Sequence, residues 1–327
     1  MKRKLHFAGI FSIFAVAIAA AAFPDHRVDL LPKLQPGQLI TYLIHFASVK
    51  KVQTESNVAV PFAPDATQID AHGLLRVEIL DVQSVNRKPV VRAKAKFLSL
   101  ELGVPAGKPG EENPRAGKQN SVPAGGSIEF TISPDGYFEK ISGLDALSPE
   151  QQQAWQEWAA LFAPAWTLPT PVAKVGDKWK SEQPEQTSSL IADLAWNRDS
   201  SYVRNETCRP SVLSPSGDFS PSTGPLDTCA VLLTTAKLTQ KSSPKDATPE
   251  DFKLHDLKTA GTAKGSNEIV TYISLTTGLV VRATEEASQQ MDVVVAKSDG
   301  SNGVHYKVDA ASRSEILLVT GTPLASH

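Results

Sequence analysis

Serine and lysine residues occur twice at a spacing that suits acyl transfer. Ser48 with Lys51, and Ser242 with Lys245, match the Ser-x-x-Lys pattern of serine acyl-transfer enzymes. That chemistry needs the serine at the start of a helix, with Ser-Asp-Asn and Lys-Thr-Gly elsewhere in the chain, and neither tripeptide is present. The first match falls at the end of an expected strand and the second in a proline-containing linker. We therefore interpret both matches as chance.

Other signatures of catalysis or metal binding are missing from the chain. There is no Gly-x-Ser-x-Gly, phosphate-binding loop, dinucleotide-binding glycine motif or His-Glu-x-x-His. The histidines after residue 22 are scattered without metal-ligand spacing: His26, His45, His72, His255, His305 and His327. Asp and Glu are plentiful, but no pair stands out as an acid/base couple. The sequence therefore predicts no catalytic residue, no metal site and no cofactor, unless folding brings scattered groups together.

The two cysteines are expected to form a structural disulfide. Cys208 and Cys229 flank a loop rich in Pro, Ser and Gly, and the segments on either side of them read as strands. Neither Cys-x-x-Cys spacing nor a nearby histidine points to metal binding or redox catalysis. In the chain-entropy model, closing a loop of this length stabilises a protein by about 3 kcal/mol.

The N-terminus has the pattern of an export signal. A basic start, Met1–Lys4, precedes an apolar run that ends in Ala20–Ala22, which fits the small-x-small cleavage rule. An uncleaved membrane anchor is the alternative, because the apolar run approaches spanning length. No cysteine lies near the cleavage site, so we expect an exported protein, periplasmic or extracellular, that is not an N-terminal lipoprotein. After cleavage we expect no transmembrane segment.

Composition limits the class of partner and favours a β-rich fold. The net charge is −2, and signal cleavage removes three further basic residues, so the mature chain is mildly acidic. Without a basic run, nucleic acid is not an expected partner. The hydrophobic fraction of 41% is ample for a core, while 20 Gly and 23 Pro suit a turn-rich β protein.

One helix is expected near the middle of the chain, over residues 149–163. Ser148 and Gln151 form a Ser-x-x-Gln capping box, and Pro149 occupies the first helical position, where its missing N–H costs nothing. Pro164 ends the run. A helix of about four turns is not stable alone, so it must pack against another element.

The helix carries an apolar face rich in aromatic residues. Trp155, Trp158, Ala159 and Phe162 follow the i, i+3, i+4, i+7 spacing, and Trp166 comes shortly after. Tryptophan suits a surface that is both apolar and hydrogen-bonding, so Trp155, Trp158, Phe162 and Trp166 are candidate ligand-binding residues. The alternative interpretation places these side chains in the core.

Strand-like segments on both sides of the helix predict a mainly β fold. Large antiparallel sheet(s) in two β-rich halves would surround the single central amphipathic helix. We divide the chain into a signal peptide (1–22), an N-terminal β-rich half (23–143), the helix with a Pro-rich connector (144–180), and a C-terminal β-rich half with the disulfide hairpin (181–327).

The segment Val175-Gly176-Asp177-Lys178-Trp179 resembles the Val-Gly-Asp-x-Trp element of exported bacterial β-rich proteins of unknown function. In those families the element follows a linker and starts a strand, and the resemblance implies no particular activity. The expected sheet with an amphipathic helix on its concave face is also similar in architecture to periplasmic lipid carriers.

Three functional hypotheses follow from these observations. The first is an exported, non-catalytic protein of the envelope or medium that binds an apolar or extended ligand, or a protein partner, in a cleft between sheet and helix. The second is an exported hydrolase whose site is assembled from scattered Asp, Glu, His or Ser. The third is a structural or assembly protein that pairs through edge strands.

Overall fold

Strands dominate the chain. The computed structural model describes residues 27–56, 66–85, 88–103, 120–121, 126–162, 172–185, 189–213, 219–221, 224 and 226–320. Within these ranges one 14-stranded sheet accompanies a two-stranded sheet, β1 (Val28–Asp29) with β8 (Val172–Ala173). The expected signal peptide and Trp166 lie outside the described residues. The predicted mainly β fold with a large antiparallel sheet is confirmed.

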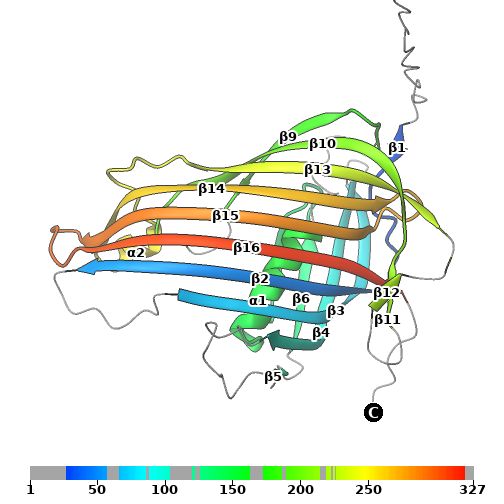
Figure 1. Cartoon of the computed structure of the whole chain (residues 1–327), viewed down its shortest axis with the longest axis horizontal. Helices are drawn as coiled ribbons and strands as arrows, with labels where there is room; N and C mark the ends of the chain where they lie inside the picture. Colours follow the sequence, from blue (N-terminus) through cyan, green and yellow to red (C-terminus); the bar gives the residue numbers. More distant parts are fainter. Residues whose placement is uncertain are drawn as a thin grey trace, which may run out of the picture.

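The large sheet places strands from both ends of the chain side by side (Figure 1). In spatial order its path is β7 (Phe138–Ser142), β6 (Ser127–Ile132), β4 (Lys88–Gly103), β3 (Ala66–Val85), β2 (Leu39–Ser56), β16 (Val304–Thr320), β15 (Val280–Lys297), β14 (Leu257–Ser274), β13 (Asp227–Gln240), β10 (Leu194–Cys208) and β9 (Lys178–Pro184). Three short strands lie off this path: β5 (Asn120–Ser121), β11 (Ser211–Leu213) and β12 (Phe219–Pro221).

The two predicted β-rich halves share this one sheet. β2 pairs with β16 from Thr41 opposite Val319 to Ser56 opposite Val304, without a register shift. The last strand of the chain therefore joins the first long one, and the hydrogen-bond ladder runs unbroken from the N-terminal to the C-terminal strands.

Alternation along the strands defines two faces of the sheet. In β4, Val91, Ala93, Ala95 and Phe97 are buried, and Arg92 and Lys96 between them are exposed. We call the face that carries these buried side chains, and those of Tyr42, Ile44 and Phe46 in β2, the inner face. The opposite, outer face carries mostly polar side chains, as expected for an antiparallel sheet with one solvated side.

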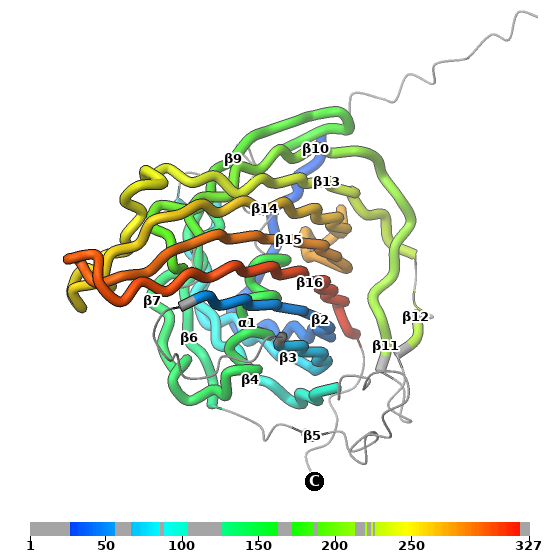
Figure 2. The backbone as a smooth tube through the Cα atoms, turned by 60° about the vertical axis from the view of Figure 1, so that its left-hand side comes forward, coloured from blue at the N-terminus to red at the C-terminus, as the bar shows by residue number. Residues whose placement is uncertain are grey.

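The sheet curves around one helix. In Figure 2 the strands from β10 to β4 follow one another around α1 (Pro149–Phe162). A 3-10 turn, η1 (Leu144–Ala146), precedes α1, and the short helix α2 (Glu250–Leu254) packs near the start of β14. None of the helices in the described ranges is long and apolar enough to cross a membrane.

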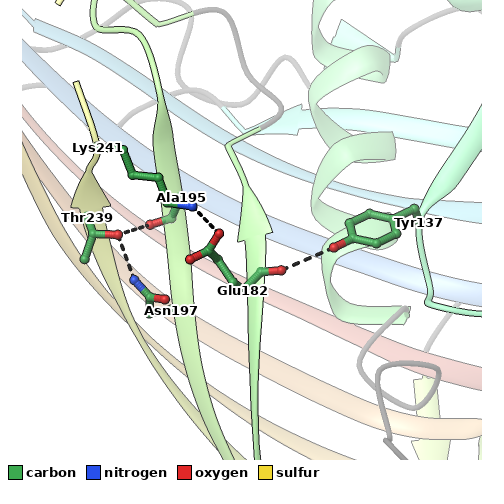
Figure 3. A network of polar contacts seen from close by, with 6 residues as sticks. All are labelled: Tyr137, Glu182, Ala195, Asn197, Thr239 and Lys241. Atoms are coloured by element: carbon green, nitrogen blue, oxygen red, sulfur yellow. Dashed lines mark hydrogen bonds and ion pairs between the residues drawn. The ribbon is translucent and has the colours of Figure 1, made fainter.

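The curvature brings the two edges of the sheet together. The Tyr137 hydroxyl, just before edge strand β7, donates a 3.2 Å hydrogen bond to the carbonyl of Glu182 in edge strand β9 (Figure 3). The Glu182 carboxylate accepts from Lys241, and Thr239 links Asn197 to the Ala195 carbonyl in the same network. Side-chain contacts thus connect edges that share no backbone ladder.

The predicted start of the helix is confirmed in detail. The Ser148 Oγ accepts a 3.2 Å hydrogen bond from the Gln151 N–H, and the Gln151 side chain accepts a 3.1 Å bond from the Ser148 N–H. This reciprocal pair satisfies two amides that the first helical turn leaves free. The helix is described to Phe162, and the last residue of the predicted range, 163, lies outside the described residues.

Aromatic packing attaches α1 to the inner face. The exposed fractions of Trp155, Trp158 and Phe162 are 2%, 0% and 2%. Trp158 stacks on Phe162 with ring centroids 4.7 Å apart, and Trp155 contacts Phe130 of β6 at 4.7 Å. Aromatic pairs in this range contribute beyond the area they bury.

The two cysteines form the predicted disulfide. Cys208 at the end of β10 bonds to Cys229 near the start of β13, and the described part of the chain holds no free cysteine. The bond closes the long connection between two strands that are already paired.

The Val175–Trp179 element forms a tight turn at the start of β9. Gly176 has φ 95°, a left-handed conformation that glycine adopts without a Cβ penalty. The Gly176 N–H donates to the Tyr202 carbonyl at 2.8 Å, and the Asp177 side chain accepts from the Lys174 N–H at 3.0 Å. The turn leads directly into the pairing of β9 with β10, so Gly176 and Asp177 have structural roles, and Trp179 is buried in the core.

Removing the Trp158 ring should destabilise the protein strongly. Trp158→Ala leaves a large cavity in the core, and we expect the free energy of unfolding to fall by about 3–5 kcal/mol. Urea unfolding followed by circular dichroism measures the change. Gln156→Ala, at an exposed position of the same helix, is the control and should shift stability by about 0.5 kcal/mol or less. Equal effects of the two substitutions would contradict the packing described above.

Candidate functional site

Folding pairs two histidines that are distant in the sequence. His45 and His72 lie opposite each other on β2 and β3, on the outer face. Each imidazole has its own carboxylate: His45 Nε2 is 3.3 Å from Asp70 Oδ1, and His72 Nε2 is 3.1 Å from Glu101 Oε2. Among the described residues, no group of three His, Cys, Asp or Glu side chains is placed to hold a metal ion.

A pocket of ≈ 310 Å³ lies between α1 and the inner face. Trp196, one of its lining residues, packs against a smaller apolar cluster that includes Leu194, Leu238 and Val293. Residues from α1, β2, β10, β15, β16 and the segment after β9 line it, including Gln153, Glu157, Ala160, Glu185, Trp196, Glu285, Ala287, Gln289, Ala310 and Ser312. Its volume is at the lower end of the range for small-molecule sites.

Small side chains form the floor of the pocket. Ala287 of β15 lies opposite Ser312 of β16, which lies opposite Ser48 of β2. In the next row of inner-face residues toward the core, the large side chains of Phe46 and Ile269 are buried. The space therefore exists because the inner face changes from large apolar residues to alanine and serine at this level.

Trp196 forms a wall of the pocket. Its Nε1–H donates a 2.8 Å hydrogen bond to Glu185 Oε2, which fixes the orientation of the indole ring. The ring also approaches Gly265 of β14 closely, since a Cβ at that position would lie 3.0 Å from Trp196 Cη2. Glycine at 265 thus leaves room for the indole to lie across the sheet.

Two carboxyl groups with perturbed acidity meet in the pocket. Burial, together with the nearby Glu157, raises the pKa of Glu285 to about 7. Burial also raises the pKa of Glu157, partly offset by the hydrogen bond that the carboxylate accepts from Ser314. Both groups line the space between helix and sheet, one from α1 and one from β15.

A buried arginine lies in the same region of the inner face. Arg198 of β10 is 8% exposed, and its Nε has no hydrogen-bond partner. Burial lowers the pKa of its guanidinium, and the charge of Glu285 opposes that change. Within the described residues no ion pair joins Arg198 to Glu285, so the guanidinium moderates the acidity of Glu285 only at longer range.

A larger groove of ≈ 900 Å³ runs along the outer face. Its polar side chains are largely paired with one another, as in Asn197 with Thr239 and Arg313 with Glu286. Charges in that groove are exposed and solvated, whereas in the inner pocket Glu285 is buried and Glu157 and Glu185 are half-buried. Perturbed titratable groups in a concave site are the stronger mark of function, so we take the inner pocket as the candidate site.

The predicted ligand-binding aromatics lie elsewhere. Trp155, Trp158 and Phe162 are in the core, and the pocket uses the adjacent helix face that carries Gln153, Gln156, Glu157 and Ala160. Trp166 is outside the described residues. A ligand-binding role for the four aromatics stays a prediction.

A signal for part of the pocket is present in the sequence. Gln153, Gln156, Glu157 and Ala160 repeat the i, i+3, i+4, i+7 spacing beside the aromatic stripe, so a second helix face with its own environment could have been recognised. Glu285 and Trp196 carry no such signal, because their neighbours come from strands distant in the sequence.

Replacing Glu285 should change how stability depends on pH. Because the folded-state pKa of about 7 exceeds the ordinary value of 4.5, the folded protein holds a proton that the unfolded chain releases. Stability contributed by this group is therefore full below pH 4.5 and is lost as the pH rises toward 7, by about 3 kcal/mol in total.

We expect Glu285→Gln to remove most of that loss, so that the variant is more stable than the original protein at pH 8 and similar to it at pH 4. Urea unfolding at the two pH values measures the difference. Glu286→Gln, the exposed neighbour on the outer face, should leave the pH dependence unchanged. An unchanged slope in Glu285→Gln as well would show that Glu285 is not buried as described.

Comparisons with known proteins place the chain in no family. No family model matches, and no curated protein matches. Among solved structures, a Bacteroides fragilis protein with a YmcC-like fold is 12% identical, with 89% of this chain and 97% of that chain covered, at a TM-score of 0.25. A mutant of the Rh. blastica porin is 9% identical, with 86% and 99% covered, at a TM-score of 0.18. At such TM-scores neither likeness bears on the function.

Proposed function

We propose that the chain is an exported, non-catalytic protein that binds a small ligand in the pocket between α1 and the inner face of the sheet. The observation that carries the proposal is the pocket itself, whose floor of Ala287, Ser312 and Ser48 leaves a space in an otherwise closely packed inner face. A concave site in which titratable groups have perturbed pKa values is a common form of ligand-binding site, and Glu157 and Glu285 line this one.

Export is supported by two independent features. The N-terminal segment has the basic start, apolar run and small-residue end of a signal peptide. The Cys208–Cys229 disulfide is of the kind that persists in oxidising compartments. The ligand is therefore one that the protein meets outside the cytoplasm.

Edge pairing with a protein partner has less support. Lys178, Lys180, Glu182 and Pro184 of edge strand β9 are exposed. Charged residues and proline along an edge discourage another strand from pairing with it. The ladder of β9 with β10 is also covered on one side by Trp179, which is buried in the core.

A hydrolase is the second candidate, because one specific observation favours it. Glu157 and Glu285 line the same pocket and both have raised pKa values, as a general acid and its partner often do. Against it, the Ser314 hydroxyl donates to Glu157 and so is held by a carboxylate rather than oriented as a nucleophile. Turnover of ester or glycoside substrates that Glu157→Gln and Glu285→Gln both abolish would favour this alternative.

Native mass spectrometry tests the binding proposal. Protein purified from the envelope fraction of its own host should carry a bound small molecule, seen as added mass that denaturation removes. Ala287→Leu fills the floor of the pocket, so we expect it to lose the added mass. Ala47→Leu makes the same change on the outer face and should retain it. Added mass kept by Ala287→Leu, or none in the original protein, would contradict the proposal.

A further inference from the structure

We infer that the ligand of this pocket carries an alkylated ammonium group, which lies against the Trp196 ring and among the carboxyl groups of Glu157, Glu185 and Glu285. The inference rests on the proposed function and names the chemical class of its ligand. Three independent features lead to it: the charge of the lining, a buried amide oxygen of Asn267 beside the pocket that accepts no hydrogen bond, and an oriented aromatic ring.

The lining of the pocket is acidic on balance. Three of its residues are glutamates, contributed by α1, by the segment after β9 and by β15. Its one cationic lining residue is Lys50, the last of the three β2 residues in the lining, and its side chain is exposed. A cationic group is the ligand chemistry that such a lining attracts, because carboxylates in a partly desolvated site interact with a positive charge much more strongly than in water.

Glu285 presents a buried carboxyl group to the pocket. The side chain is 7% exposed, and its Oε1 accepts a hydrogen bond from the Asn267 side-chain amide. No hydrogen bond within the described residues reaches its other oxygen, Oε2. Asn267 Oδ1, also buried on the inner face beside Ala287, has no partner either. Buried acceptors without donors are costly, and a positively charged ligand group would offset that cost.

Trp196 supplies the aromatic surface that alkylated ammonium groups prefer. Its indole N–H is already bonded to Glu185, so the ring rather than the N–H is left for a ligand. A carboxylate that accepts from the indole N–H also increases the electron density of the ring. Cations within about 6 Å of a tryptophan ring centroid are attracted to its face, and aromatic rings with carboxylates recognise quaternary ammonium groups.

Binding of a cation must displace a proton from the site near neutral pH. The pKa of Glu285 is raised to about 7. Burial, Glu157 and Glu185 raise it, and Arg198 from β10 lowers it. A bound positive charge favours the ionised carboxylate and so lowers the pKa of Glu285. Affinity for the cation should therefore rise as the pH increases through 7 and fall below it.

The test compares choline with 3,3-dimethylbutan-1-ol, its neutral carbon isostere, by isothermal titration calorimetry of the mature protein. We expect choline to bind about tenfold more tightly than the isostere at pH 8, because only choline carries the positive charge that the Trp196 ring and the carboxylates attract. Titration in two buffers of different ionisation enthalpy should show proton release with choline at pH 7 and none with the isostere.

Two variants make the test specific. Glu285→Gln should remove the proton release and weaken choline about tenfold, with the affinity of the isostere unchanged. Glu286→Gln, on the outer face, should behave like the original protein. Equal affinity for both probes, or choline binding without proton release, would overturn the inference and leave the pocket a neutral-ligand site. The inference would also be overturned if choline does not bind and the native ligand is neutral or anionic. If the protein carries no native ligand at all, the proposed function is overturned instead.

Discussion

The structure depends on one packing interaction, the burial of the aromatic face of α1 against the inner face of the sheet. A curved sheet of this length exposes a large apolar concave surface unless another element covers it, and α1 is the longest helix in the described ranges. Trp155, Trp158 and Phe162 fill the concavity together with Tyr42 and Phe130. The Tyr137–Glu182 contact then closes the edges around a core that the helix has already filled.

The pocket is a consequence of where that packing stops. Along β15 and β16 the inner face passes from Ala283 and Ile316, through Glu285 and Ser314, to Ala287 and Ser312. The aromatic stripe of the helix does not reach the last of these rows, and Trp196 stands beyond them on β10. Ionisable groups placed at this boundary are desolvated by the core on one side and remain accessible from the pocket on the other, which explains the perturbed acidity of Glu157 and Glu285.

Local features could be predicted from the sequence, whereas contacts between distant segments could not. The capping box at Ser148 and the disulfide depend on spacing within a few residues or on chemistry with one possible partner, and both are confirmed. The pairing of β2 with β16, and the meeting of Glu157 with Glu285, depend on the register of strands far apart in the chain. The tryptophan face of the helix was the feature that the sequence made most apparent, but its described side chains are buried in the core. The pocket is lined by the helix face beside it.

Hydrogen exchange of the α1 amides, measured by mass spectrometry under native conditions, tests the central claim most directly. If α1 is an integral part of the core, the amides of residues 153–162 should exchange only through global unfolding, with the same free energy as the central strands β2 and β16. Exchange of these amides at the rate of an exposed helix, while β2 and β16 stay protected, would show that the sheet is stable without α1 and would contradict the account.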